Sequence, residues 1–188
     1  MLQERKRMLK EALGDPDEEV RLAASEALEN LESVLGLEQI RAALGDQDRG
    51  NRIRAIFALE RFRSPEIFPL LLAALKDPQA DVRGASIQVL GRKKNPKTIG
   101  SLVKHLRDPH PAVRVHAAEA LGHFSDPRLV PYLGALLAAE DDALVKGAVR
   151  SLAALGFVEA HPFLVPLLHD PRPGVRREAV RALGRLGV

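Results

Sequence analysis

The stretch KDPQADVRGASIQVLG, residues 76–91, contains an Asp-Pro pair, three further residues and then Val-Arg. The same order returns in segments that begin at residues 13, 107 and 169. These segments read LGDPDEEVRLAASEALEN, RDPHPAVRVHAAEALGHF and HDPRPGVRREAVRALGRL. One pattern that returns at a fixed spacing is typical of a repeat protein.

The period is 31 residues and spans the whole chain without insertions. Several positions keep the same residue type in all six copies. One of them is leucine throughout: Leu28, Leu59, Leu90, Leu121, Leu152 and Leu183. The pattern therefore predicts one domain, residues 1–188, built by stacking one unit.

Each unit is predicted to hold two helices. The helix after Asp-Pro, here called the first-type helix, is expected to bury one face at i, i+4, i+7 and i+8, as in Val82, Ser86, Val89 and Leu90. The helix before Asp-Pro, the second-type helix, has Ile67, Leu71, Ala74 and Leu75 at similar spacing. Since no strand pattern competes, the prediction is an all-α fold of about five helix pairs with a half-repeat at each end.

The two ends of the chain differ from the repeats between them. Residues 2–13 are predicted to form a second-type helix, in which Arg5 and Lys6 replace the apolar residues of later copies, as expected of a polar N-terminal cap. Residues 172–187 are predicted to form a first-type helix without a following partner. That end is either capped by other means, docked against another chain, or continued in a longer solenoid.

The Asp-Pro motif has a structural interpretation. Asp is expected to cap the first-type helix, Pro to begin it and Val to face the core. The arginine can reach the aspartate of its own or the adjacent repeat, which predicts a ladder of charge-assisted bonds. Its members are Asp15, Arg21, Asp46, Arg52, Asp77, Arg83, Asp108, Arg114, Asp170 and Arg176.

Composition excludes several classes of protein. The 188 residues contain no cysteine, so disulfides, thiolate metal sites and cysteine nucleophiles are absent. The first ten residues are charged rather than apolar, and no apolar run approaches a membrane span. The expectation is a soluble cytoplasmic protein, and the excess of arginine over lysine suggests a thermophilic source.

The motif DPxxxVRxxAxxAL with a 31-residue period resembles the short HEAT-like repeats of the type found in phycobilisome lyases. The resemblance covers essentially the whole chain. It implies a right-handed α–α superhelix, an α-solenoid with second-type helices on its concave side. It implies a binding surface rather than a particular activity.

The expected function is a non-catalytic scaffold that binds a peptide or protein on the concave face. Side chains that vary between repeats on the second-type helices form an apolar stripe with a basic flank, which suits a partner with apolar anchors and acidic residues. The alternative is that these side chains pack against neighbouring turns. The candidate residues are Leu70, Lys97, Ser101, Lys104, Arg128, Tyr132 and Phe163.

Charge segregation supports a second hypothesis, binding of nucleic acid or another polyanion. Residues 11–38 hold nine acids and one arginine, whereas residues 82–107 hold seven basic residues and no acid. The scarcity of aromatic residues and the acidic segment argue against binding of nucleic acid. The same charge segregation would also allow head-to-tail self-association, acidic end to basic end. The basic patch 92–107, with the arginine-rich C-terminus, contains Arg92, Lys93, Lys94, Lys97, Lys104 and Arg107.

Catalytic motifs are not found. The six histidines make no metal-binding pair with a third ligand, and no glycine-rich phosphate loop or nucleophile elbow occurs. The prediction is no catalytic residue, no metal and no cofactor. A phycobilin-lyase-like or chaperone component remains an alternative by resemblance alone, because the shared residues belong to the scaffold.

Overall fold

A computed structural model describes residues 1–186, all of them in helices, turns or connecting segments. The chain divides into two compact units, residues 1–64 and 65–188, and each is considered by itself. None of the helices in the described part combines the length and apolar character that a membrane span requires. The prediction of an all-α fold of repeated helices is confirmed.

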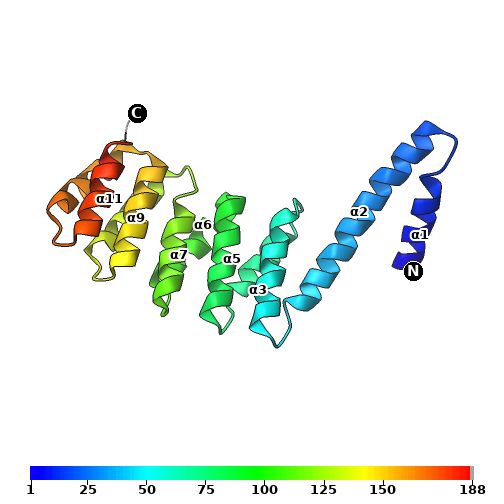
Figure 1. Ribbon diagram of the computed structural model, residues 1–188, viewed down its shortest axis with the longest axis horizontal. Helices are drawn as coiled ribbons and strands as arrows, with labels where there is room; N and C mark the ends of the chain where they lie inside the picture. Colours follow the sequence, from blue (N-terminus) through cyan, green and yellow to red (C-terminus); the bar gives the residue numbers. More distant parts are fainter. Residues whose placement is uncertain (187–188) are drawn as a thin grey trace. The chain divides into compact units, whose positions relative to one another are not determined.

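The first unit holds three α-helices and one short 3₁₀-helix, coloured blue to cyan in Figure 1. Helix α1 packs against the N-terminal half of α2, and α3 packs against α2 further along the chain. The elements are α1 (Leu2–Ala12), α2 (Glu18–Ala43), α3 (Arg49–Ala58) and η1 (Leu59–Arg61).

In the second unit, the first-type helices α5, α7, α9 and α11 pack in order, and each also packs on the second-type helix before it. The first-type helices are α5 (Ala80–Lys93), α7 (Pro111–Leu121), α9 (Asp142–Leu155) and α11 (Pro173–Leu183). The second-type helices are α4 (Ile67–Ala74), α6 (Ile99–Lys104), α8 (Val130–Gly134) and α10 (His161–Leu164). Short 3₁₀-helices flank them: η2 (Pro96–Thr98), η3 (His105–Arg107), η4 (Pro127–Leu129), η5 (Ala135–Ala138), η6 (Val158–Ala160) and η7 (Val165–His169).

Glycines allow the first-type helices of the second unit to approach closely. A Cβ atom at Gly91 would lie 2.8 Å from the Cβ of Ala120, and one at Gly122 would lie 2.7 Å from the Oγ of Ser151. Both distances are shorter than a non-bonded contact allows. The close packing of α5, α7 and α9 therefore requires glycine at positions 91 and 122.

The Asp-Pro turns are held by two sets of polar bonds. In each turn that ends in Val-Arg or its equivalent, the Nη1 of the arginine donates to the backbone carbonyl of the aspartate at 2.8–3.0 Å. The same Nη1 also donates to the carbonyl of the next residue. The aspartate carboxylate accepts from the backbone N–H two residues later at 2.8–2.9 Å.

The predicted N-cap was therefore wrong. Each first-type helix begins three residues after the aspartate of the turn, and its N-cap is the residue two positions after that aspartate, so the aspartate makes an Asx turn instead of capping the helix. Among the true N-cap residues, Asp17, Asp48 and Asp141 accept bonds from the helix backbone, whereas Gln79, His110 and Arg172 make no side-chain cap.

Side-chain bonds also join adjacent repeats. Arg83 donates to both carboxylate oxygens of Asp108, with Nη2–Oδ1 2.7 Å and Nε–Oδ2 2.9 Å. In the fifth repeat, where Ala139 and Val145 replace the usual pair, Arg172 of the next turn donates to the carbonyl of Ala139 at 3.1 Å. A neighbouring repeat therefore supplies the bond that this turn lacks.

The first repeat departs from the predicted pair of helices. Its two helices are fused into α2, which continues through residues 31–36 without a break. Later repeats break here at Pro65, Pro96 and Pro127, or at residues with positive φ, Lys94 (51°) and Gly156 (73°). The first repeat has Val34 at the proline position, and Gly36 is packed on the ring of Phe62, so nothing interrupts the helix.

The terminal helices were predicted with different accuracy. Helix α1 ends one residue before the predicted limit at residue 13. Helix α11 runs from Pro173 to Leu183 and is shorter than the predicted span 172–187. Residues 187 and 188 lie outside the described part of the chain.

We predict that Val34→Pro destabilises the first unit by about 3 kcal/mol, because proline inside a helix removes a backbone bond and clashes with the preceding turn. Thermal unfolding followed by circular dichroism measures the change, with Val34→Ala as the control that keeps the helix intact. A Val34→Pro chain as stable as the wild type would show that α2 is broken at this position in solution.

We predict that Asp108→Asn destabilises the chain by about 2 kcal/mol near neutral pH, since Arg83 then loses its charged partner. Burial alone would raise the pKa of Asp108, but the bonds from Arg83 and from the His110 backbone N–H outweigh it and lower that pKa. An aspartate with a lowered folded-state pKa stabilises the fold above its unfolded pKa of about 4, and that contribution is lost as the pH falls further.

The free energy of unfolding, measured from pH 7 to pH 3, should therefore fall more steeply for the wild type than for Asp108→Asn. The control is Glu38→Gln, because Glu38 pairs with Arg41 and both side chains are more than half exposed, and exposed pairs contribute little. Parallel pH profiles for wild type and Asp108→Asn would contradict this assignment.

Candidate functional site

The seven residues predicted to bind a partner lie on consecutive second-type segments of the second unit. Leu70 is in α4, Ser101 and Lys104 are in α6, Tyr132 is in α8 and Phe163 is in α10. The two remaining residues precede these helices, Lys97 in η2 and Arg128 in η4. The repeat places them along one series of segments, as the spacing of 31 residues requires.

A groove of about 450 Å³ lies between α4 and α6 and contains two of these residues, Ser101 and Lys104. Lys76 and Lys104 are exposed and line it, so two cations border a largely apolar surface. Such a surface suits an apolar anchor accompanied by a carboxylate. The other lining residues are Pro69, Leu72, Ala73, Leu75 and His105.

His105 holds the two sides of this groove together. Its Nδ1 lies 2.8 Å from the carbonyl oxygen of Ser101, and its Nε2 lies 3.1 Å from the carbonyl oxygen of Leu75. The ring therefore connects the end of α6 to the end of α4. A histidine whose ring nitrogens both contact backbone carbonyls has a structural role in positioning the groove.

The apolar members of the predicted stripe are not equally accessible. Tyr132 is 51% exposed, whereas Leu70 is partly buried and therefore less accessible. Phe163 is 38% exposed, but its ring packs on Gly134, where a Cβ atom would lie 2.5 Å from its Cδ1. Tyr132 is therefore the best-placed apolar contact for a partner, and Phe163 also packs the stack.

Arg128 is engaged by an acidic residue that the sequence analysis did not select. Its Nη2 lies 2.7 Å from Oδ2 of Asp126 and its Nε lies 2.9 Å from Oδ1. The bond raises the pKa of Arg128 and lowers the pKa of Asp126. The signal was available in the sequence SDPR, in which the two residues are two positions apart. Their opposite charges offset each other, which reduces the attraction of Arg128 for an acidic partner.

Around Arg128 lies a second groove, of about 550 Å³, between the α5–α6 connection and the α7–α8 connection. Lys94 lines it together with Asp126 and Arg128. It is therefore more mixed in charge than the groove between α4 and α6. Its remaining lining residues are Pro96, Ile99, His123, Phe124, Ser125 and Pro127.

The residues of the polyanion hypothesis fall into two groups. Arg92, Lys93, Lys94 and Lys97 precede α6, whereas Lys104 and Arg107 stand at its C-terminal end and in η3. Arg83, which contributes to the basic segment, is bound to Asp108. The basic residues therefore flank α6 at both ends.

Metal-ligating side chains do not gather in groups of three or more anywhere in residues 1–186. The acidic residues near the fifth turn serve the fold: Asp141 caps α9 and Asp142 pairs with Lys146 at 2.6 Å.

Comparison with solved structures supports the repeat architecture. The complex of CpcE and CpcF of phycocyanin lyase from Nostoc sp. PCC7120 has 27% identity and a TM-score of 0.68, with 80% of this chain and 65% of that chain covered. The chain thus spans just under two thirds of that structure. A search of the curated proteins gives no match.

Two further structures share the fold at lower identity. The Escherichia coli protein YibA has 23% identity and a TM-score of 0.62, with 98% of this chain and 68% of that chain covered. A designed armadillo repeat protein in complex with the peptide (KR)4 has 19% identity and a TM-score of 0.57, with 97% and 99% covered.

Family models match nearly the whole chain. HEAT-repeat models match residues 37–106, 68–153 and 146–188, and a single HEAT-repeat model matches residues 7–35. These matches cover both units, including the first repeat with its fused helix. The chain belongs to the HEAT-repeat family.

Proposed function

We propose that this protein is a non-catalytic scaffold that binds a peptide or protein partner on the second-type helices of its second unit. The observation that carries the proposal is the groove between α4 and α6, where Lys76 and Lys104 border an apolar surface. Tyr132, half-exposed on α8, extends the same series of segments. A partner with an apolar anchor and acidic residues fits this arrangement.

Two similar structures support protein or peptide binding as the general class. CpcE is described in complex with CpcF, and the designed armadillo protein is described with a peptide. Both have folds of stacked helical repeats, which offer long surfaces for partners.

Polyanion binding is less well supported, because the basic residues flank α6 in two groups and include no stacking aromatic. Its signature would be affinity that falls steeply with added salt. The partner experiment below therefore includes nuclease treatment and two salt concentrations.

A component of a bilin lyase is the second candidate, on the ground of the similarity to the CpcE–CpcF complex. The chain has no cysteine and so holds no bilin through a thioether. Reversible binding of phycocyanobilin would be detected as a change in its visible absorption spectrum. An unchanged spectrum at saturating protein would remove this candidate.

We predict that the double substitution Tyr132→Ala with Lys104→Glu weakens capture of the partner by about tenfold or more, because it removes an exposed aromatic anchor and reverses a bordering charge. Partners are captured from a cell lysate on immobilised protein and identified by mass spectrometry, and the affinity is then measured with the purified partner.

The matched control is Val180→Ala with Arg177→Glu, which makes the same kinds of change at exposed positions on the first-type helix α11. Circular dichroism verifies that both variants fold. Equal capture by the Tyr132 and Lys104 variant would exclude this surface, and recovery of nucleic acid alone, lost with nuclease or salt, would exclude the scaffold proposal.

A further inference from the structure

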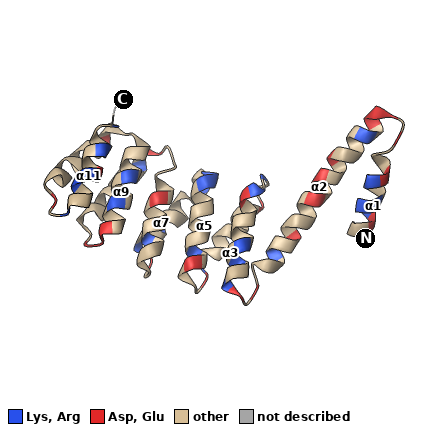
Figure 2. Ribbon diagram, in the orientation of Figure 1, with Lys and Arg blue, Asp and Glu red and all other residues tan. Residues whose placement is uncertain are grey.

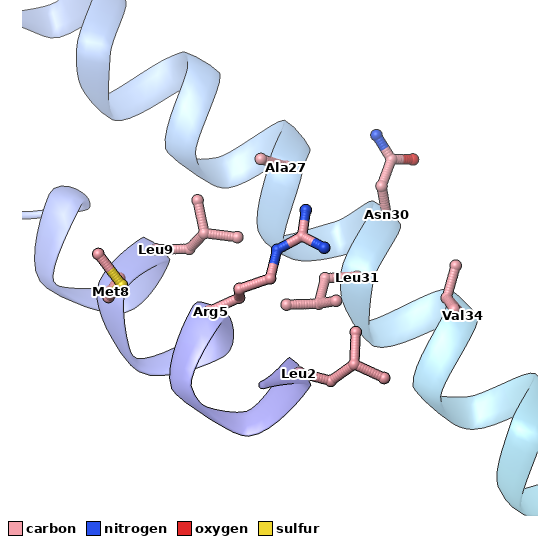
Figure 3. Close-up of a pocket in the computed structure, with 8 residues that line it drawn as sticks. All are labelled: Leu2, Arg5, Met8, Leu9, Ala27, Asn30, Leu31 and Val34. Carbon is pink, nitrogen blue, oxygen red and sulfur yellow. The ribbon is translucent and has the colours of Figure 1, made fainter.

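A third groove, in the first unit, lies between α1 and the middle of α2 and has a volume of about 560 Å³. Figure 3 shows its lining residues, which come from these two helices alone. Leu2, Met8 and Val34 are exposed apolar residues in it. The full lining is Leu2, Arg5, Met8, Leu9, Ala27, Asn30, Leu31 and Val34.

The repeat shows what normally covers this position. In the second unit, consecutive second-type helices lie side by side, as His105 joins α6 to α4 and Phe163 of α10 packs on α8. The neighbour of α1 would be the second-type segment of the first repeat. That segment is the C-terminal half of α2, which continues straight on and packs with α3. The place beside α1 is therefore left open.

Burial at equivalent positions shows how open the first unit is. Val20 of α2 is 41% exposed, whereas its counterparts in the second unit are at most 4% exposed. These counterparts are Val82, Val113, Leu144 and Val175. The first-type part of α2 is therefore less covered by the rest of the described chain than the first-type helices of the second unit.

Arg5 gives the open groove a specific chemistry. Its counterparts in the second unit, Ile67, Thr98, Leu129 and Ala160, are at most 1% exposed. Figure 3 shows the side chain of Arg5 reaching from α1 toward α2 between Leu9 and Leu31. It is the one charged residue among those lining the groove, and its guanidinium has no hydrogen-bond or ion-pair partner within residues 1–186. A guanidinium bordered by apolar side chains is suited to a carboxylate.

We propose that the groove between α1 and α2 binds an amphipathic helix of a partner protein, which presents apolar residues to the groove and one carboxylate to Arg5. The helix would take the place of the missing second-type helix. Outside the groove α2 is acidic, as the red segments in Figure 2 show, so basic residues on the flanks of the bound helix would be favoured.

The test uses two synthetic peptides of about 16 residues, stapled on one face to hold them helical because free peptides of this length are marginal helices. Both carry leucines at i, i+4 and i+7 spacing and lysines on the flanks. One has a glutamate within the leucine stripe and the other a lysine at that position. Fluorescence anisotropy measures their binding to the full chain.

The wild-type protein should bind the glutamate peptide about threefold to tenfold more tightly than the lysine peptide. Arg5→Glu should reverse that preference. The matched control, Lys10→Glu, makes the same change on the same helix at a residue that does not line the groove, and it should leave the preference unchanged. Circular dichroism verifies that each variant is folded.

Three results would overturn the proposal. The first is no binding of either peptide at about 1 mM protein, as expected if a segment of the chain itself fills the groove or if Arg5 serves only as a solvated cap. The second is an unchanged preference in Arg5→Glu. The third is loss of binding in the Tyr132→Ala, Lys104→Glu variant, which would place the peptide on the surface of the second unit.

Discussion

The Asp-Pro turn is the constraint on which the repeat depends, because it reverses the chain from a second-type helix to a first-type helix. The arginine that follows binds the carbonyls of the aspartate and of the next residue, while the aspartate carboxylate accepts a backbone N–H. These bonds satisfy backbone groups that a reversal would otherwise leave unpaired. Where Ala139 and Val145 replace the pair, Arg172 of the next turn donates to the exposed carbonyl. The reversal therefore survives loss of its own side chains.

The opposite reversal, from a first-type to a second-type helix, uses side-chain bonds of another kind, since Asn95 and Asp126 cap the 3₁₀-helices that follow them. It depends on a proline or on a residue in the left-handed region, such as Gly156. Val34 stands at the proline position of the first repeat, and there the chain continues as α2. Val158 stands at the same position in the fifth repeat, but there Gly156 ends the helix in the left-handed region. The first repeat has neither the proline nor the glycine, which accounts for the fused helix and for the open groove between α1 and α2.

Much of this architecture could be predicted from the sequence, because helix type and buried positions follow from a period of 31 residues. The N-cap was misplaced because Asp suits both a cap and an Asx turn, and only backbone geometry separates them. The fused helix was not predicted, because the residues shared with the other repeats continue through the first repeat although it lacks the proline. Asp126 was missed although the sequence SDPR places it two residues before Arg128, because the spacing alone does not show that Arg128 folds back onto it. The groove bordered by Lys76 and Lys104 was not predicted, because it forms only where α4 and α6, which are 25 or more residues apart in sequence, pack together.

The central claim, that α2 is one continuous helix, can be measured directly because the chain has no native cysteine. Spin labels on Ala23→Cys and Ala42→Cys, both exposed positions of α2, report the length of the helix by double electron–electron resonance. With a rise of 1.5 Å per residue, a continuous helix places the Cα atoms of positions 23 and 42 about 28 Å apart, so the distance distribution should be narrow. A main population well below about 20 Å would show that the first repeat folds back like the others and would contradict the account.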